Sequence, residues 1–306
     1  MTPLLVGVEI GGTKLQLVTG EPSGAITARF RFAVDRAQGA AGIRQHIQST
    51  LARVQQQHRL GGVGVGFGGP IAWRTGRVCC SHHVEGWSDF PLGEWLHSLT
   101  RVPVQVDNDA NVAALGEAQA GAGTGRDPVF YITLGSGVGG GLVNRGTIYH
   151  GAAPGEAEIG HVRLDRSGAT VESRCAGWAV DRRVQAVIAR EPACLLARLA
   201  GGCEGAEARY LGPALEQGDA AAQRILRETC EDLAFGLSHV VHLFHPDVVV
   251  IGGGLSLLGE PLRAGVAAAL PGFIMTAFAP GPAVVLAALG EDAVPVGALR
   301  LAGAAR

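Results

Sequence analysis

Two glycine-rich turns decide the fold: Val8-Glu9-Ile10-Gly11-Gly12-Thr13-Lys14 near the start of the chain and Ile132-Thr133-Leu134-Gly135-Ser136-Gly137-Val138-Gly139-Gly140-Gly141 near its middle. Each turn follows an apolar run of β type, and an apolar run resumes after it, at residues 15–18 and 141–143. Because glycine has no Cβ, backbone N–H groups in such turns can converge on phosphate oxygens. The repeated strand–turn–strand plan predicts a duplicated α/β fold with a cleft between two lobes, where ligand sites concentrate.

The rest of the chain continues this plan. A third strand and glycine turn occupies residues 248–254, as Val248-Val249-Val250-Ile251-Gly252-Gly253-Gly254. Hydrophobic spacing predicts further elements: helices over 36–58, 111–120 and 219–243, and strands over 63–67, 102–106 and 129–134. Residues 166–215 are polar, rich in Gly and Ala, and helical only in patches.

Composition indicates an enzyme without nucleic-acid or membrane partners. The 306 residues carry a formal net charge of −2, so nothing draws the chain to nucleic acid or anionic lipid. No apolar run approaches the ~20 residues that a membrane-spanning helix needs, and the first strand begins at once, without a leader. The six cysteines show no regular framework. We therefore expect a cytoplasmic location, where thiols stay reduced.

The glycine runs have three other interpretations. Residues 135–140 satisfy the spacing G-x-G-x-x-G, but a dinucleotide-binding turn must open a helix, and residues 142–147 have no helical period. A Walker loop is also absent, because the first turn lacks its spacing and is followed by a strand. A glycine-rich hairpin without a ligand remains the simpler alternative.

The stretch Asp107-Asn108-Asp109-Ala110-Asn111 opens a helical run between the first two turns. At the start of a helix the backbone N–H groups and the dipole favour an ionised carboxylate. Asp107 or Asp109 could serve only as an N-cap. Between phosphate-binding turns, however, Asp109 is a candidate general base for phosphoryl transfer.

Two other polar stretches are candidate ligands. Glu156, Glu158 and His161 follow a Gly/Pro loop, and carboxylate plus imidazole can fix vicinal sugar hydroxyls. Cys79-Cys80-Ser81-His82-His83 looks like a metal site, but neighbouring residues of a strand point to opposite faces. We predict no zinc there.

These motifs together resemble the ROK family of sugar kinases (repressor, open reading frame, kinase) within the actin-like/hexokinase superfamily. The resemblance covers residues 5 to about 303. It rests on ordered motifs: Glu9-Ile10-Gly11-Gly12-Thr13-Lys14, Asn108-Asp109-Ala110-Asn111, Leu134-Gly135-Ser136-Gly137-Val138-Gly139-Gly140-Gly141, Glu158-Ile159-Gly160-His161, Val250-Ile251-Gly252-Gly253-Gly254 and Leu289-Gly290-Glu291-Asp292-Ala293.

The resemblance implies a two-lobed, duplicated actin-like (ribonuclease H-like) α/β fold with a central interlobe cleft. The smaller lobe would comprise residues 1–112 plus 290–306, and the larger lobe residues 113–289. It also implies a homodimeric, ATP- and Mg²⁺-dependent hexose kinase, with Asp109 as base and Glu9 as a magnesium ligand. Phosphates and ATP would contact Gly11, Gly12, Thr13, Lys14, Thr133, Gly135, Ser136, Gly137, Gly253 and Gly254. The sugar would contact Gly69, His83, Asn108, Asp109, Glu158 and His161.

The sequence departs from the family pattern at several places. Glu9 replaces the usual aspartate, and His83 stands where the family offers an asparagine to the sugar. The family's zinc element is a His followed by Cys-x-Cys-Gly-x-x-Gly-Cys, of which only His161 and Cys175 remain. Two ligands cannot hold a structural zinc, so none is expected. Glu9 and His83 also keep an alternative open, a catalytically weak or inactive sugar-binding sensor of the same family.

Overall fold

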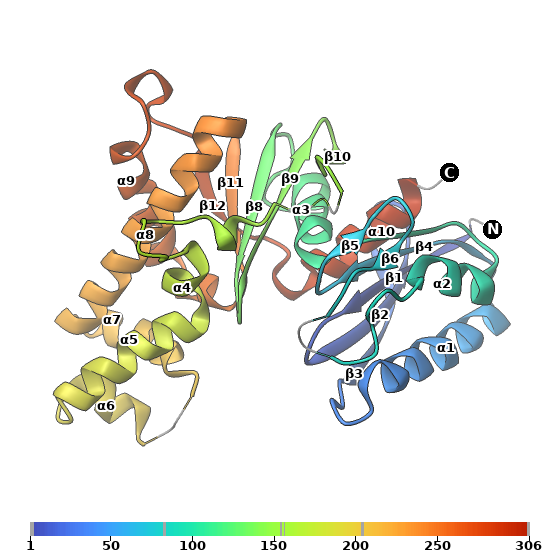
Figure 1. The fold of residues 1–306 in the computed structure, drawn as a ribbon, viewed down its shortest axis with the longest axis horizontal. Helices are drawn as coiled ribbons and strands as arrows, with labels where there is room; N and C mark the ends of the chain where they lie inside the picture. Colours follow the sequence, from blue (N-terminus) through green and yellow to red (C-terminus); the bar gives the residue numbers. More distant parts are fainter. Residues whose placement is uncertain (1–2, 82–83, 154, 156, 203–204, 305–306) are drawn as a thin grey trace. The chain divides into compact units, whose positions relative to one another are not determined.

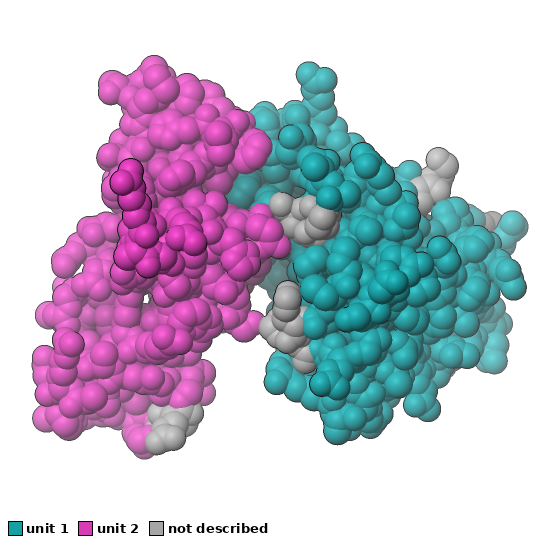
Figure 2. All heavy atoms as spheres, in the orientation of Figure 1, with its two compact units in different colours: residues 1–131, 141–157, 288–306 teal, residues 132–140, 158–287 magenta. Residues whose placement is uncertain are grey.

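The structure is a computed structural model that describes residues 3–81, 84–153, 155, 157–202 and 205–304 (Figure 1). The chain forms two compact units. Unit 1 comprises residues 1–131, 141–157 and 288–306, and unit 2 comprises residues 132–140 and 158–287 (Figure 2). The lobe boundaries expected from the resemblance, after residue 112 and before residue 290, stay a prediction.

The sheet of unit 1 is mixed. Its strand order is β3-β2-β1-β4-β7. β1 pairs with β2, and β2 with β3, in antiparallel fashion, whereas β1–β4 and β4–β7 are parallel pairs. The strands are β1 (Leu4–Ile10), β2 (Lys14–Gly20), β3 (Ile26–Ala33), β4 (Leu60–Phe67) and β7 (Val104–Asn108). A small hairpin, β5 (Ile71–Ala72) with β6 (Arg77–Val78), lies between β4 and β7 in the chain.

Helices cover both faces of this sheet. Ile43, Ile47, Leu51 and Val54 of α1 recur every three or four residues, and they share a buried core with strand residues and with α2. α3 and α10 pack on the other side, so closely that a Cβ at Gly64 would lie 1.9 Å from the carbonyl oxygen of Ala298. The helices are α1 (Gly39–Gln57), α2 (Leu92–Thr100), α3 (Asp109–Ala120) and α10 (Ala293–Ala304).

The second sheet repeats the topology of the first. Its order is β10-β9-β8-β11-β12, the same sequence of neighbours, and the division between the units falls within β8 and β9. The strands are β8 (Val129–Leu134), β9 (Val138–Asn144), β10 (Thr147–Ile148), β11 (Val248–Gly252) and β12 (Ala283–Leu286). The predicted duplicated α/β fold is therefore confirmed.

Unit 2 also contains residues 166–215, for which the sequence predicted no definite elements. The described residues between 166 and 216 form four helices, and the predicted long helix follows as α8. The helices are α4 (Val171–Cys175), α5 (Gly177–Arg190), α6 (Leu195–Ala200), α7 (Leu211–Glu216), α8 (Ala220–Phe244) and α9 (Glu260–Ala269). In the described part of the chain, no helix combines the length and apolar character needed to cross a bilayer.

Candidate active site

Strand register brings the first glycine turn and the Asp107–Asn111 stretch to one edge of the unit 1 sheet. Ile10 pairs with Phe67, and Phe67 with Asn108, across the parallel strands β1, β4 and β7. The next residues along each strand, Gly11, Gly68 and Asp109, therefore leave the sheet at the same edge. This is the carboxyl edge of the parallel strands, where α/β folds place their ligands.

Asn108, and neither neighbouring aspartate, caps α3. Its Oδ1 accepts the backbone N–H groups of Ala110, at 2.9 Å, and Asn111, at 3.4 Å. The suggestion that Asp107 or Asp109 is only an N-cap is therefore wrong. Asp109 is the first helical residue, and its Oδ1 accepts the Ala110 N–H at 2.9 Å.

Gly68 and Gly69 lie beside these two side chains. A Cβ on Gly68 would lie 3.3 Å from Oδ2 of Asp109, so the carboxylate rests directly against this glycine. Asn108 Nδ2 donates to the carbonyl oxygen of Gly69 at 3.3 Å. The structure thus brings the predicted residues Gly69, Asn108 and Asp109 together.

The first glycine turn is a tight connection between β1 and β2. The Gly11 N–H donates to the Lys14 carbonyl oxygen at 2.9 Å and closes the turn. Lys14 Nζ lies 3.2 Å from Oε1 of Glu9, and Gln16 Nε2 donates to Oε2 of Glu9 at 2.9 Å. Oxygen is the donor that Mg²⁺ prefers. The Glu9 carboxylate is chemically suited to that ion, although both its oxygens already accept partners.

Gln16 carries this network further into unit 1. The side chain of Gln16 is fully buried, and its Oε1 accepts from Arg29, at 2.6 Å, and from Arg31, at 2.9 Å. Arg29 also pairs with Asp292 at 2.7 Å. The Gln16 amide therefore lies between the Glu9 carboxylate and two guanidinium groups. Its NH₂ group donates to the carboxylate, and its oxygen accepts from both arginines.

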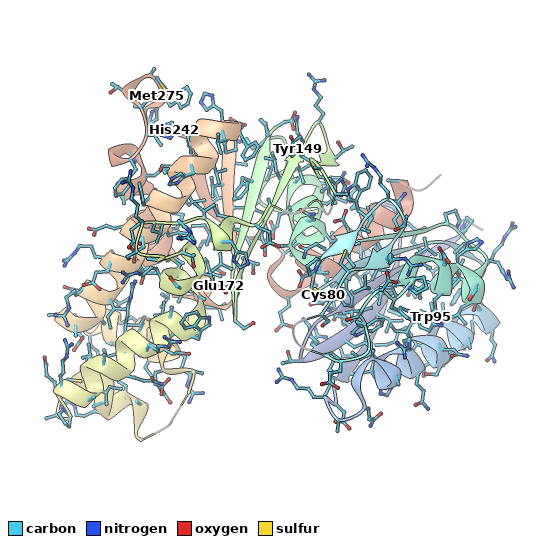
Figure 3. All side chains as sticks on the ribbon, in the orientation of Figure 1. Cys80, Trp95, Tyr149, Glu172, His242 and Met275 are labelled. Carbon is cyan, nitrogen blue, oxygen red and sulfur yellow. The ribbon has the colours of Figure 1, made fainter. Side chains whose placement is uncertain are left out.

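The second glycine turn is held by helices of unit 2. The Gly135 N–H donates to the Gly137 carbonyl oxygen at 2.9 Å, and the Gly177 N–H donates to the Gly135 carbonyl oxygen at 2.8 Å. Glu172 of α4 accepts the Val138 N–H at 2.9 Å (Figure 3). Sequence reasoning missed Glu172, because nothing in the local pattern connects it to the turn.

Strand β9 begins at Val138, earlier than predicted. The glycines at 139–141 therefore belong to the strand, and the turn consists of residues 135–137. Thr133 lies in β8, half-buried, and Ser136 is exposed at the turn. Gly253 faces the same strand with φ +81°, and a Cβ there would lie 2.5 Å from the Leu134 backbone nitrogen, so only glycine fits.

A pocket of about 850 Å³ opens beside this turn, within unit 2. Its walls are mainly apolar, with a few charged side chains, as is typical of sites for small molecules and cofactors. The lining residues are Leu134, Gly135, Ser136, Gly177, Trp178, Asp181, Ala206, Ala208, Arg209, Gly212, Pro213, Glu216, Gly254, Leu255, Leu257 and Leu258. The predicted residues Gly135, Ser136 and Gly254 lie together there. The sequence did not indicate most of the other lining residues, because they come from residues 166–215, where the hydrophobic pattern predicted no definite elements.

Two carboxylates fix the pocket wall formed by the 3₁₀ segment η2 (Glu207–Tyr210). Asp181 Oδ1 accepts the Ala208 N–H at 2.6 Å. The buried Glu207 accepts from Gln185 Nε2 at 2.9 Å and from the Gly205 N–H at 2.8 Å. Burial acts to raise the pKa of Glu207, but the hydrogen bonds from Gln185 and Gly205 outweigh it and lower that pKa. The wall therefore carries an ionised, hydrogen-bonded carboxylate.

The predicted sugar ligands Glu158 and His161 belong to unit 2, at the 3₁₀ segment η1 (Ile159–His161). His161 Nε2 and Glu158 Oε2 are 3.9 Å apart, and the His161 side chain is 76% exposed. Both side chains therefore remain accessible to a ligand. The other two predicted ligands of this kind, His83 and Glu156, lie outside the described residues.

The two remnants of the family's zinc element do not fit a structural zinc. Cys175 is fully buried, and its Sγ donates to the Thr229 carbonyl oxygen at 3.8 Å. Burial, followed by the Asp232 charge, raises the thiol pKa of Cys175 far above its ordinary value. Within the described residues, no group of three or more His, Cys, Asp or Glu side chains has the placement of a metal site.

This chain is similar in sequence and in fold to known proteins of one family. The model of the family described as ROK family matches residues 5–305. A glucokinase of Thermotoga maritima is 32% identical over 96% of this chain and 95% of its own, and a glucokinase of Halalkalibacterium halodurans is 31% identical over 95% and 92%. The crystal structure of a ROK family glucokinase from Streptomyces griseus, in complex with glucose and AMPPNP, superimposes with a TM-score of 0.82 at 32% identity, covering 98% of this chain and 99% of that one.

The chain therefore belongs to the ROK family and is a sugar kinase with the two-domain, actin-like fold. Its reaction is sugar phosphorylation.

Proposed function

We propose that the protein phosphorylates a hexose, glucose or a closely related sugar, by in-line transfer of the γ-phosphoryl group of ATP. The observation that carries this proposal is the carboxylate of Asp109, at the first turn of α3, beside Gly68 and next to the capping Asn108. The identities to two bacterial glucokinases favour glucose among the hexoses.

Asp109 acts as the general base. A hydroxyl oxygen of the sugar attacks the γ-phosphorus, and its proton passes to the Asp109 carboxylate. The bond between the γ-phosphorus and the β–γ bridging oxygen breaks, and ADP leaves with that electron pair. Because the transition state is loose, most of the rate enhancement comes from positioning and charge neutralisation.

The two glycine turns and Lys14 supply the neutralisation. Backbone N–H groups at turns of this kind bind phosphate oxygens, and a lysine adds a positive charge. The proposed phosphate and nucleotide ligands are Gly11, Gly12, Thr13, Lys14, Thr133, Gly135, Ser136, Gly137, Gly253 and Gly254. The mainly apolar pocket beside Leu134 is large enough for a purine nucleoside.

Hydrogen-bonding groups of the chain bind the sugar hydroxyls, and among the proposed ligands are Gly69, Asn108, Asp109, Glu158 and His161. Glu9 would hold Mg²⁺ together with the nucleotide phosphates, and the ion would supply charge neutralisation for the transferred phosphoryl group. The homodimer and the cytoplasmic location remain predictions.

A coupled-enzyme assay of ADP release tests the proposal. Glucose, mannose, fructose, N-acetylglucosamine and N-acetylmannosamine are compared with ATP and Mg²⁺, and we expect glucose to give the highest kcat/KM. Asp109→Asn keeps the size of the side chain but removes the base, so kcat should fall by about 10²- to 10⁴-fold while glucose binding persists.

Asp165→Asn is the matched control, since Asp165 is an exposed carboxylate in the loop before α4. If the Asp109→Asn variant had the same kcat as the wild type, Asp109 would not be the general base. Sugar binding by the wild type without turnover on any of the five sugars would favour the sensor alternative.

A further inference from the structure

His150 forms a largely buried pair with Asp107, two residues before the proposed base. His150 follows β10, and its Nε2 lies 2.5 Å from Oδ2 of Asp107. The two side chains are 14% and 5% exposed, and both belong to unit 1. An ionised carboxylate only accepts hydrogen bonds, so Nε2 of His150 carries the hydrogen. A short contact of this type is charge-assisted and strong.

The other oxygen of Asp107 connects this pair to the site. Asp107 Oδ1 accepts the Asn108 N–H at 2.8 Å and Asn111 Nδ2 at 3.0 Å. Asn108 is both the cap of α3 and the residue before Asp109. One carboxylate therefore receives donors from His150, from the capping residue and from the first turn of the helix.

A second bond attaches the same loop to the same place. Asn111 Nδ2 also donates to the Gly155 carbonyl oxygen at 3.1 Å. His150 and Gly155 thus tie the two ends of residues 150–155 to the junction of β7 and α3. The chain then runs on to Glu158, a proposed sugar ligand.

Stacking fixes the plane of the imidazole. The rings of Trp73 and His150 are 4.0 Å apart between centroids, with an interplanar angle of 11°. The Arg74 guanidinium lies 4.9 Å from the centroid of the Trp73 ring. The indole therefore holds the His150 ring in one orientation, with Nε2 directed at Asp107.

We propose that His150 is a positioning residue for sugar phosphorylation. Through Asp107 it sets the backbone at Asn108 and so the direction of the Asp109 carboxylate, and it anchors the loop that leads to Glu158. This inference rests on the proposed function. It differs from simple core packing, because it requires the hydrogen bond and not only the ring.

Two substitutions separate the hydrogen bond from the ring. His150→Phe keeps a ring on Trp73 but has no N–H for Asp107. His150→Gln loses the ring but places an amide donor about as far along the side chain as Nε2. His46→Phe is the control, since His46 also stacks on an aromatic ring of unit 1, that of Phe32, with centroids 4.4 Å apart.

Steady-state kinetics with glucose and ATP give the first measurement. A hydrogen bond to a charged group is strong enough that His150→Phe should lower kcat/KM for glucose by about 10- to 100-fold. The KM for ATP should stay within about twofold, because the bonds of His150 lead to the proposed sugar ligands. His150→Gln should recover most of the loss, and His46→Phe should match the wild type. Equal defects in His150→Phe and His150→Gln would assign His150 to packing and overturn the inference.

Hydrogen exchange gives a measurement that needs no turnover. In His150→Phe the amides of Asn108, Ala110 and Asn111 should exchange faster than in the wild type and in His46→Phe. Unchanged protection together with unchanged kcat/KM would overturn the positioning role. A wild type without activity would defeat the proposed function instead, and the exchange data would still decide whether the pair orders this junction.

Discussion

At the scale of single residues, Glu9 is a departure from the family pattern whose contacts the structure shows directly. The carboxylate is largely buried, and its two oxygens accept Lys14 and Gln16. The longer side chain thus has an observed role in the resting protein, where it neutralises and orients Lys14. A magnesium ion bound by Glu9 would have to share this carboxylate with Lys14.

We predict that Glu9→Ala raises the Mg²⁺ concentration needed for half-maximal activity several-fold. The substitution removes an oxygen donor for the ion and the partner of Lys14. Titration of activity against free Mg²⁺ at saturating sugar and ATP measures the effect. Glu9→Asp, which keeps the charge one methylene shorter, is the matched control. An unchanged Mg²⁺ dependence in Glu9→Ala would leave Glu9 with the structural role alone.

The buried thiols allow a prediction about pH. Burial, and then the Glu231 charge, raises the pKa of Cys230 to about 12, and burial also raises the pKa of Cys175. Thiols in the unfolded chain release their protons near pH 8.5, whereas these two keep theirs in the folded state. Above about pH 8.5 the unfolded chain binds fewer protons, so the free energy of unfolding should fall as pH rises.

Thiol labelling and alkaline melting curves check this prediction. At pH 8 in the folded protein, the exposed Cys79 should react and Cys175 and Cys230 should not, as peptide mapping would reveal. Cys230→Ala should weaken the loss of Tm between pH 8.5 and 10. Rapid labelling of Cys230 in the native state would contradict its burial.

At the scale of elements, buried periodic segments were predictable and exposed ones were not. The helix expected over 36–58 is α1, because its apolar residues recur on one face. β3 was missed, since most of its side chains are partly or fully exposed at the sheet edge and its arginines obscure the alternation. The sequence did not identify Asn108 as the cap of α3, because Asp and Asn have similar cap propensities and only the fold orients Asn108.

In the candidate site, too, some residues could be predicted from the sequence and others could not. The glycine turns and Asp109 are local motifs, so sequence reasoning found them. Glu172 and the His150–Asp107 pair depend on contacts between residues far apart in the chain, which no local pattern encodes. The pocket wall at Trp178 and Arg209 comes from α5 and η2, which contact each other only through the tertiary fold, as in the bond from the Ala208 N–H to Asp181.

Glu117 of α3 also acts over a long sequence distance. It is fully buried and accepts three backbone N–H groups, those of Ala122 at 2.7 Å, Ala288 at 3.1 Å and Leu289 at 2.8 Å. The carboxylate therefore joins the end of α3 to the segment that leads to α10. All of these residues belong to unit 1.

We predict that Glu117→Gln lowers the free energy of unfolding by about 3 kcal/mol. The new amide would point a donor at backbone donors inside a buried site. Urea unfolding of both proteins measures the change. Glu94→Gln, at an exposed position in the first turn of α2, should change stability by less than about 0.5 kcal/mol. A similar small effect at Glu117 would show that water replaces the lost acceptor.

At the scale of the whole molecule, the protein should be stable without zinc. Cys175 packs against Thr229, while Arg183 bonds to Thr229 at 2.8 Å and to Asp232 at 2.7 Å. This partly buried network occupies the surroundings of Cys175. Elemental analysis of the purified protein should therefore find well below one zinc per chain, and a zinc chelator should leave Tm unchanged. Stoichiometric zinc, lost on chelation with a fall in Tm, would contradict this.

The close packing of α10 bears on the order of events during synthesis. A Cβ on Gly297 would lie 1.8 Å from the Val112 carbonyl oxygen, and α10 also lies against β4 at Gly64. Every residue of unit 2 is translated before residue 288. The nascent unit 1 therefore lacks the part of its sheet cover that α10 provides until the ribosome has made all of unit 2. Chains stalled with residue 287 just outside the exit tunnel should be cleaved by protease within unit 1, and those that expose residue 304 should resist.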